Sequence, residues 1–305
     1  PGVTAPDLRE GAPRIAGEAL LRDPGGALAI DDVAAPSMSG RFIAQPGLGA
    51  HVIGYTHDTL WVRFRLANAD SDAIGSVLQA GVPRLRDVRL YTRDDGGGWR
   101  EARAGLDAPD GAIRSRYPVF PVVLGPHEER EYFLRVQSGN AIHVWLAAWR
   151  PGEFLAHERR IDVVNALQFG AELLLAVYGL ILFAGTRDRS YLIFAFLLAS
   201  NLGYEVSMFQ YGHQYLWPGA AEWSMRAPGF FMGLLCVANV LLLTHLLRTR
   251  EQLPRLHALL WLLAGFAALF ALLALTTPYA ATVLPLQGTI LLVVVLSLGT
   301  TAYAA

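Results

Sequence analysis

Five apolar runs, each about twenty residues long, follow one another from Asn165 to the C-terminus of this 305-residue chain. At a rise of 1.5 Å per residue, a helix of that length matches the roughly 30 Å hydrocarbon core of a bilayer. Five such runs with few charges are typical of membrane spans rather than of buried helices in a soluble protein. We therefore predict helical spans near residues 165–184, 191–210, 228–247, 256–275 and 285–303.

The charged residues are concentrated before these runs. The chain has 25 basic and 26 acidic residues, and all but six of each lie at or before Arg160. A net charge of −1 argues against a nucleic-acid partner, because phosphate contacts need a basic excess. Cys236 is the only cysteine, so no disulfide can form within the chain.

Arginine placement in the short loops predicts the orientation of the spans. The predicted loops after the first and third spans contain five arginines, whereas the loop after the second contains only Arg226. The positive-inside rule places the arginine-rich loops in the cytoplasm and the segment before the first span outside. The five arginines are Arg187, Arg189, Arg248, Arg250 and Arg255.

The first half shows a different pattern, with short segments in which apolar and polar residues alternate. A period of two indicates strands with one buried face, and Gly-rich and Asp-rich turns separate them. We predict an all-β sandwich of jelly-roll type over residues 18–160, after an extended segment 1–17. The clearest predicted strands are Trp61–Leu66, Val88–Tyr91, Tyr132–Val136 and Ile142–Leu146.

Several segments resemble one bacterial family, the seven-transmembrane receptors with diverse intracellular signalling modules. The outer half resembles the type-two extracellular domain of these receptors, and the apolar half resembles their membrane domain. The resemblance covers roughly Glu18 to the end, and the two halves occur in the family's order. It is carried by residues 48–56, Leu60–Phe64, Ala80–Tyr91, Gly125–Ser138, Arg187–Leu192 and Gln214–Pro218.

The resemblance implies a sensor in the bacterial inner membrane, with a carbohydrate-binding-like periplasmic domain and a cytoplasmic histidine kinase, diguanylate cyclase or phosphatase. Such outputs act in pairs, so it also implies a homodimer. The chain contains five of the seven helices and no output module, so we expect it to be a fragment. Gly179 stands where the family's first helix is expected to have a polar residue.

No catalytic motif is present, so we expect neither an enzyme nor a cofactor within this chain. We expect a small ligand, carbohydrate-like or a cation, or a protein partner. Exposed aromatic rings with nearby hydrogen-bonding groups suit carbohydrate, although a sandwich core also needs most of its large aromatics. No set of metal ligands is predicted. The candidate ligand-binding residues are Tyr55, Trp61, Arg63, Arg84, Asp87 and Trp145.

Ionisable residues inside predicted spans are costly and usually face protein or water. Glu172 lies in the first span, Glu205 lies toward the outer end of the second, and Arg226 enters the third from that side. We expect these three to form a polar cluster that couples the outer domain to helix packing. Interfacial snorkelling with one neutral carboxyl is the competing interpretation.

Two alternatives to a sensor stay open from the sequence. In a transporter or channel component, the embedded carboxylates would form a proton or ion pathway. A cell-envelope binding protein without signalling would have no cytoplasmic domain.

Overall fold

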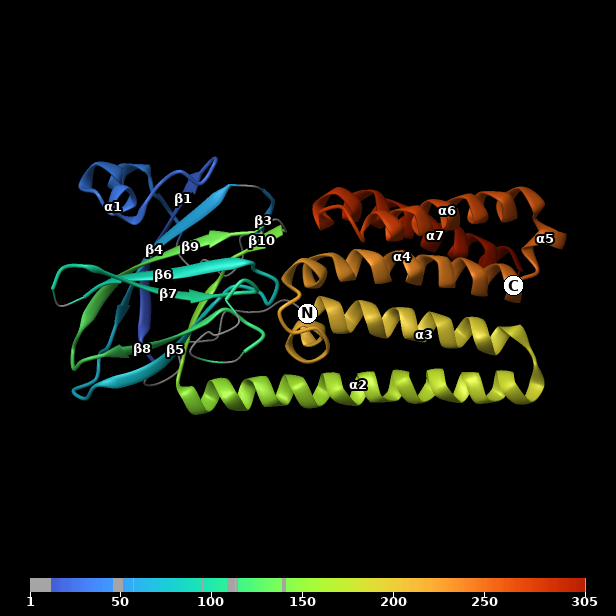
Figure 1. The fold of residues 1–305 in the computed structure, drawn as a ribbon, viewed down its shortest axis with the longest axis horizontal. Coiled ribbons are helices and arrows are strands. Elements are labelled where there is room, and N and C mark those ends of the chain that lie inside the picture. Colours follow the sequence, from blue (N-terminus) through green and yellow to red (C-terminus); the bar gives the residue numbers. More distant parts are fainter. Residues whose placement is uncertain are drawn as a thin grey trace. The chain divides into compact units, whose positions relative to one another are not determined.

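A computed structural model of the protein describes residues 12–45, 52–56, 58–94, 96–108, 113, 115–138 and 141–304. Side chains are described throughout these ranges except at 52–55, 141, 297 and 299–304. The chain forms two compact units, divided after Arg160 (Figure 1). The first is built of strands and the second of helices, which confirms the predicted fold class.

The strands of the first unit form three antiparallel sheets. The largest sheet has the order β2-β1-β4-β9-β6-β7, the second is β11-β5-β8, and the third pairs β10 with β3. The strands are β1 (Arg14–Asp23), β2 (Ile43–Ala44), β3 (Val52–Tyr55), β4 (Thr59–Ala67), β5 (Ile74–Ala80), β6 (Asp87–Arg93), β7 (Trp99–Ala104), β8 (Val119–Leu124), β9 (Glu129–Gln137), β10 (Ala141–His143) and β11 (Leu146–Trp149).

A single apolar core lies between the six-stranded and three-stranded sheets. Alternate residues of β4, among them Phe64, and Leu134 of the neighbouring β9 face Leu78 of β5 and Phe120 of β8 across this space. All four side chains are at most 1% exposed. The chain passes repeatedly from one layer to the other, since β4, β6, β7 and β9 belong to one sheet and β5, β8 and β11 to the other. This is a jelly-roll-like sandwich.

The predicted strand Ile142–Leu146 is divided in the structure. β10 ends at His143 and pairs with β3, whereas β11 begins at Leu146 and pairs with β5. The predicted alternation continues across the break: Ile142 and Leu146 face the central core, and Trp145 faces the opposite side. Alternation reports which face a side chain occupies, but it does not report which strand supplies the hydrogen bonds.

A short helical cap covers part of the outer face of the six-stranded sheet. It consists of α1 (Ile30–Val33) and the 3-10 helix η1 (Pro36–Arg41). Val33 of this cap packs in one cluster with Trp61, Tyr91 and Phe133 of the sheet. The cap is joined to β7 by a 2.8 Å hydrogen bond that the Trp99 indole Nε1 donates to Asp31.

Helix α2 (Pro151–Thr186) begins well before the predicted span, which started at Asn165. A hydropathy pattern detects only the apolar part of a helix, whereas the first turns here are stabilised by the sandwich. Phe154 is 1% exposed and packs with Trp149 and Val77 on the outer face of the three-stranded sheet. Pro151 at the helix start is compatible with a first turn that has no hydrogen bond to lose.

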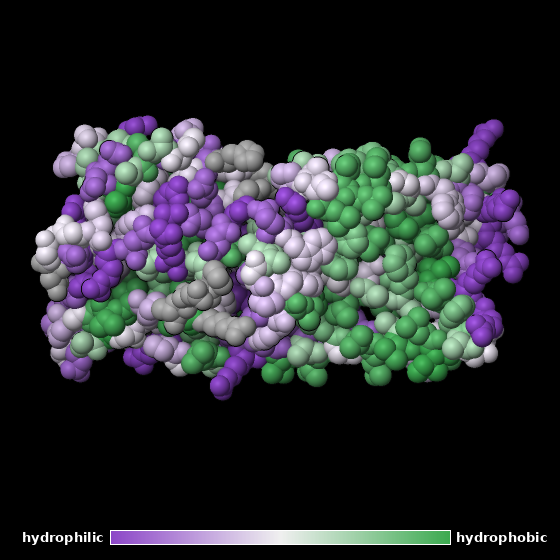
Figure 2. Space-filling view, in the orientation of Figure 1, coloured by the Kyte–Doolittle hydropathy of each residue, from purple (hydrophilic) through white to green (hydrophobic). Residues whose placement is uncertain are grey.

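The second unit continues α2 and adds α3 (Arg189–Met208), a π-helical turn η3 (Gly212–Leu216), α4 (Ala221–Leu246), α5 (Thr249–Gln252), α6 (Pro254–Leu273) and α7 (Tyr279–Ala304). Among the described residues, α2, α3, α4, α6 and α7 are long and apolar enough to cross a membrane. Large apolar side chains point outward, for example Leu174 at 69% and Leu262 at 69% exposure. Figure 2 shows the resulting hydrophobic surface over these helices. This surface is what a lipid environment requires.

Two helices start earlier than their apolar runs. The predicted third and fifth spans begin at Pro228 and Pro285, but both prolines lie inside helices, α4 and α7. A proline is tolerated in a membrane helix where neighbouring groups satisfy the freed backbone. α4 occupies the centre of the unit, since it contacts α3, α6 and α7.

Candidate functional site

The outer face of the six-stranded sheet has a polar half beside the cap. Arg135 of β9 is directly opposite Arg89 of β6, and Arg89 is directly opposite Arg103 of β7. Like charges directly opposite one another on neighbouring strands destabilise a sheet. The three guanidinium groups therefore need carboxylates between them.

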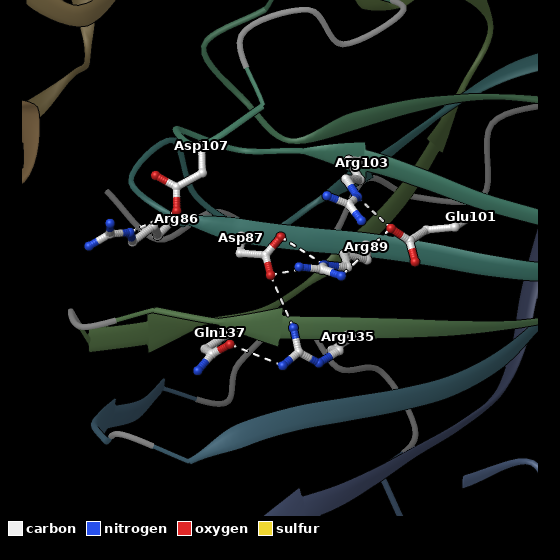
Figure 3. Close-up of polar contacts among 8 residues, drawn as sticks. All are labelled: Arg86, Asp87, Arg89, Glu101, Arg103, Asp107, Arg135 and Gln137. Carbon is white, nitrogen blue, oxygen red and sulfur yellow. Dashed lines mark hydrogen bonds and ion pairs between the residues drawn. The ribbon is translucent and has the colours of Figure 1, made fainter. Parts of the chain in front are cut away.

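Asp87 and Glu101 supply those carboxylates (Figure 3). Both oxygens of Asp87 accept hydrogen bonds from Arg89 Nε at 3.0 Å, and its Oδ2 also accepts one from Arg135 Nη1 at 3.0 Å. Glu101 forms ion pairs with Arg89 and with Arg103. The network thus alternates cation and anion across three strands, and it joins β9 to β6 and β6 to β7.

The protonation of these groups reflects their contacts. Hydrogen bonds to Asp87 raise the pKa of Arg89, which stays charged at every physiological pH. Burial alone would raise the pKa of Glu101, but hydrogen bonds from Arg103 and Tyr91 outweigh it and hold the pKa below its usual value. Three cations and two anions make up the row, so it carries a net positive charge at neutral pH.

Three of the predicted ligand-binding residues lie on this outer face. Trp61, Arg63 and Asp87 all point to the outer side of the sheet. Trp61 and Arg63 alternate along β4 with residues that face the core, and Asp87 precedes the core-facing Val88 of β6. Asp87 belongs to the ionic network. Trp61 is fully buried under the cap, and Arg63 lies 4.8 Å from the Phe42 ring centroid.

The other three predicted residues lie elsewhere. Trp145 is 9% exposed and packs in the cluster with Phe154, on the outer face of the three-stranded sheet. Arg84 is 8% exposed and belongs to the segment of the chain that connects β5 to β6. The side chain of Tyr55 is outside the described residues. The prediction that these six residues bind a ligand stays untested, and Trp61 and Trp145 contribute to packing.

Within the described ranges no group of three or more His, Cys, Asp or Glu side chains is arranged to hold a metal ion. Asp94 accepts hydrogen bonds from the backbone N–H groups of Gly96 and Gly98. Asp107 is occupied by Arg86, whose Nε lies 2.8 Å from its carboxylate.

A second polar arrangement lies between α2 and α3. Asp162, Asn165, Gln168 and Glu172 recur every three or four residues, so they share one face of α2. Asn165 donates a 2.8 Å hydrogen bond to the Tyr211 hydroxyl, which in turn donates one of 2.8 Å to Asp162. We refer to these residues, with Asn201 and Glu205 of α3, as the polar ladder.

The two carboxylates of the polar ladder are linked by amides. Gln168 Nε2 lies 2.7 Å from Glu205 Oε2 and 3.4 Å from Glu172 Oε1. Asn201 Nδ2 donates to both oxygens of Glu172 at 3.1 Å. The only hydrogen bonds that the structure describes for the side-chain carboxylates of Glu172 and Glu205 come from neutral amides.

Arg226 is not part of this arrangement. Its Nη2 bonds Glu222 at 3.2 Å, and its Nη1 donates to the carbonyl oxygen of Leu275 at 3.3 Å. The structure therefore joins two of the three residues expected to cluster and places the third with other partners. Tyr211 and Asp162 were missed, although Asp162 precedes Asn165 by one helical turn and so continues the polar face.

The family-like segment between the first two spans also has a defined geometry. Arg187 adopts a left-handed backbone with φ of 59°, and Asp188 caps α3 by accepting a 2.9 Å hydrogen bond from Ser190 N. That backbone hydrogen bond lowers the pKa of Asp188. The carboxylate thus stays ionised at the positive end of the α3 dipole.

A strand sandwich with an ionic outer face, followed in the chain by apolar helices that contain a polar ladder, defines a multi-pass membrane protein with a separate strand domain. Comparison with known families agrees. A family model described as "7TMR-DISM extracellular 2" matches residues 18–150, and one described as "7TM diverse intracellular signalling" matches residues 161–305. The chain belongs to the 7TMR-DISM family of transmembrane sensory receptors. No curated protein matches it.

Proposed function

We propose that this chain is the sensing and membrane part of a receptor in the bacterial inner membrane. The strand unit faces the periplasm and senses a small ligand, carbohydrate-like or a cation, or a protein partner. The signal passes through the helices to a cytoplasmic histidine kinase or diguanylate cyclase module, and the receptor works as a homodimer. The orientation is supported by the arginines in the loops after the first and third helices.

One observation carries the signalling part of the proposal, namely that α2 is a single uninterrupted helix from Pro151 to Thr186. Its first turns belong to the packing of the sandwich: Phe154 is buried, and His157 lies against Trp149 with ring centroids 4.7 Å apart. Ser115 Oγ also donates a 2.7 Å hydrogen bond to Glu158. A rearrangement of the sandwich around these residues therefore displaces the start of a membrane helix.

The length of α2 fits this role. Thirty-six residues at 1.5 Å each extend over about 54 Å, whereas a bilayer core needs about 30 Å. The excess includes the first turns, Pro151–Arg160, which belong to the strand unit. A helix is stiff along its axis, so a shift or rotation at one end reaches the other.

In this scheme α2 moves between two positions against α3, and the hydrogen bonds of the polar ladder hold one of them. Hydrogen bonds from one helix to the other break or form as sets, because Gln168 and Asn201 each hold a carboxylate on the partner helix. A ligand can shift such an equilibrium only through its different affinity for the two states. Glu172 and Glu205 are the coupling residues in this scheme.

The test replaces Glu172 and Glu205 in the full-length receptor by Leu and by Gln, and measures the output activity at equal membrane levels. We expect E172L and E205L to change the basal output severalfold and the Gln variants, which can still accept from an amide, to change it less. L174A is the matched control, because Leu174 is exposed on another face of α2. Parental output from both Leu variants would contradict the coupling scheme.

The embedded carboxylates are also the observation that favours the alternative, a transporter or channel component. Purified protein in liposomes separates the two. A proton or cation flux that E172Q and E205Q abolish would support transport, and its absence would support signalling.

A further inference from the structure

The strand unit contains a cleft between its two large sheets, at the edge where β7 and β8 are the outermost strands. Its volume is about 420 Å³, which is within the size range of small-molecule sites. Leu90, Ala102 and Val122 form an apolar floor that belongs to the central core or packs against it. Of the predicted ligand-binding residues whose side chains are described, none lines this cleft.

The side chains at the cleft carry more positive than negative charge. Arg93, Arg100 and Arg130 line it together with Asp94 and Glu128. The two carboxylates already have partners. Asp94 accepts from two backbone N–H groups, and Glu128 accepts from the Gly125 N–H and from Arg130.

The three arginines differ in how many hydrogen bonds and ion pairs their guanidinium groups already form. Arg93 donates to the Gly97 carbonyl oxygen at 2.7 Å and lies 4.0 Å from the centroid of the Trp99 ring. Arg130 pairs with Glu128. Arg100 has no hydrogen-bond or ion-pair partner among the residues described, so its guanidinium is available to a ligand.

Two hydroxyl groups lie in line with Arg100 on the core-facing side of the sheet. Arg100 of β7 is directly opposite Thr92 of β6, and Thr92 is directly opposite Tyr132 of β9. The Thr92 hydroxyl oxygen is buried in the lining of the cleft. Burial raises the pKa of Tyr132, so its phenol stays protonated and can donate a hydrogen bond.

We propose that this cleft binds a small organic anion, with its carboxylate or phosphate group at Arg100 and Arg130 and its body on the apolar floor. A planar guanidinium matches a carboxylate or phosphate through paired N–H donors. The hydroxyls of Thr92 and Tyr132 supply further polar contacts deeper in the cleft. The inference concerns binding alone, and it holds whether or not the polar ladder transmits a signal.

The experiment uses the full chain purified in detergent, with binding measured by calorimetry and by thermal shift. The probes are glucuronate, glucose 6-phosphate and neutral glucose, so that carboxylate, phosphate and uncharged sugar are compared on similar bodies. We expect at least one anion to bind and to raise the melting temperature, and glucose not to do so. The anion that binds identifies the preferred headgroup.

Two matched variants locate the site. Arg100 and Arg103 are both exposed residues of β7, but they point to opposite faces of the sheet, since Arg100 lines the cleft and Arg103 belongs to the ionic network of the outer face. We expect R100Q to weaken anion binding about tenfold, since a hydrogen bond to a charged group is lost, and R103Q to leave it unchanged. We expect R130Q also to weaken anion binding. The proposal is overturned if neither anion binds, if glucose binds equally well, or if R103Q weakens binding as much as R100Q.

Discussion

In the strand unit, Asp87 accepts hydrogen bonds from Arg89 and Arg135, whereas in the helical unit Glu172 accepts them from Asn201 and Gln168. The Asp87 carboxylate is partly exposed to water and is neutralised by two cations. The Glu172 carboxylate has only neutral donors among the described residues, in a segment apolar enough to span a membrane. Ion pairing explains why Asp87 is tolerated where it is, whereas a carboxyl group that only amides bond is costly in an apolar segment. That cost is a reason to assign Glu172 a role beyond stability.

The two units also differ in where they are densely packed. The sandwich fills its centre with large side chains, while the helices approach one another through small ones. A Cβ atom added at Gly233 of α4 would lie 2.6 Å from Ala271 Cβ and 2.8 Å from the Ala267 carbonyl oxygen of α6. Small residues at such crossings are how membrane helices come close. Removing volume should therefore damage one unit, and adding volume should damage the other.

The largest effect is expected from removing a large side chain in the sandwich. Phe64 is fully buried and stacks on Tyr132. F64A should destabilise the strand unit by about 3–5 kcal/mol, because it loses burial and leaves a cavity. Hydrogen exchange of the strand amides in the purified full chain measures this. L174A, which truncates an exposed residue of α2, should leave those amides as slow as in the parent.

Adding volume to the helical unit should have the next largest effect. G233V places a branched side chain where α4 meets α6, and it should cost about 1–3 kcal/mol or separate the two helices. Thermal unfolding in detergent, followed by helical circular dichroism, reports the change. Gly265 of α6 has open space around an added Cβ, so G265V is the control. Equal losses in the two variants would argue against a close α4–α6 contact.

Breaking the ionic network should have a similar or smaller effect in the strand unit. D87A leaves Arg89 and Arg135 directly opposite each other without the carboxylate between them, and it should cost about 1–3 kcal/mol. Denaturant unfolding of the full chain measures the loss. E129A removes a more exposed partner, that of Arg65, and should have no measurable effect. A neutral D87A variant would mean that the network contributes no net stability.

The smallest expected effect is a pH dependence from Glu101. Its pKa is lower in the folded protein than its ordinary value of 4.5, so its ion pairs stabilise the fold above about pH 4.5. That stabilisation is lost as the pH falls through the folded pKa. E101Q should remove this part of the acid sensitivity, so its melting temperature should fall less steeply between pH 5 and pH 3 than that of the parent. Identical slopes would contradict the assignment.

The membrane half was largely predictable from sequence, because an apolar run as long as a bilayer is thick has few other uses. The ends of the helices were less predictable. Pro228 and Pro285 lie within helices rather than at their starts. Helix α2 starts at Pro151, before its apolar run, because the sandwich stabilises its first turns and local hydropathy does not report that contact. In the strand half, alternation identified the buried faces, including those on both sides of the break between β10 and β11.

For the candidate sites too, local sequence patterns predict the residue types but not their contacts. Glu172 and Glu205 could be singled out because a carboxyl in an apolar run is rare, and the polar face of α2 follows from its helical period. That Gln168 links them while Arg226 bonds Glu222 depends on how the helices pack. The row of Arg135, Arg89 and Arg103 could not be inferred, because it needs the register of β6 against β7 and against β9, which lies far from β6 in the sequence.

By itself, then, the amino-acid sequence determined the class of each half, the buried face of most strands and the presence of costly charges in the apolar runs. These properties depend on the period and length of local patterns, which any short window of sequence contains. Only the tertiary structure decided which charges meet, which helix turns the sandwich holds, and where the cleft beside Arg100 opens. Those depend on strand register and helix packing, which are set by contacts between residues far apart in the chain.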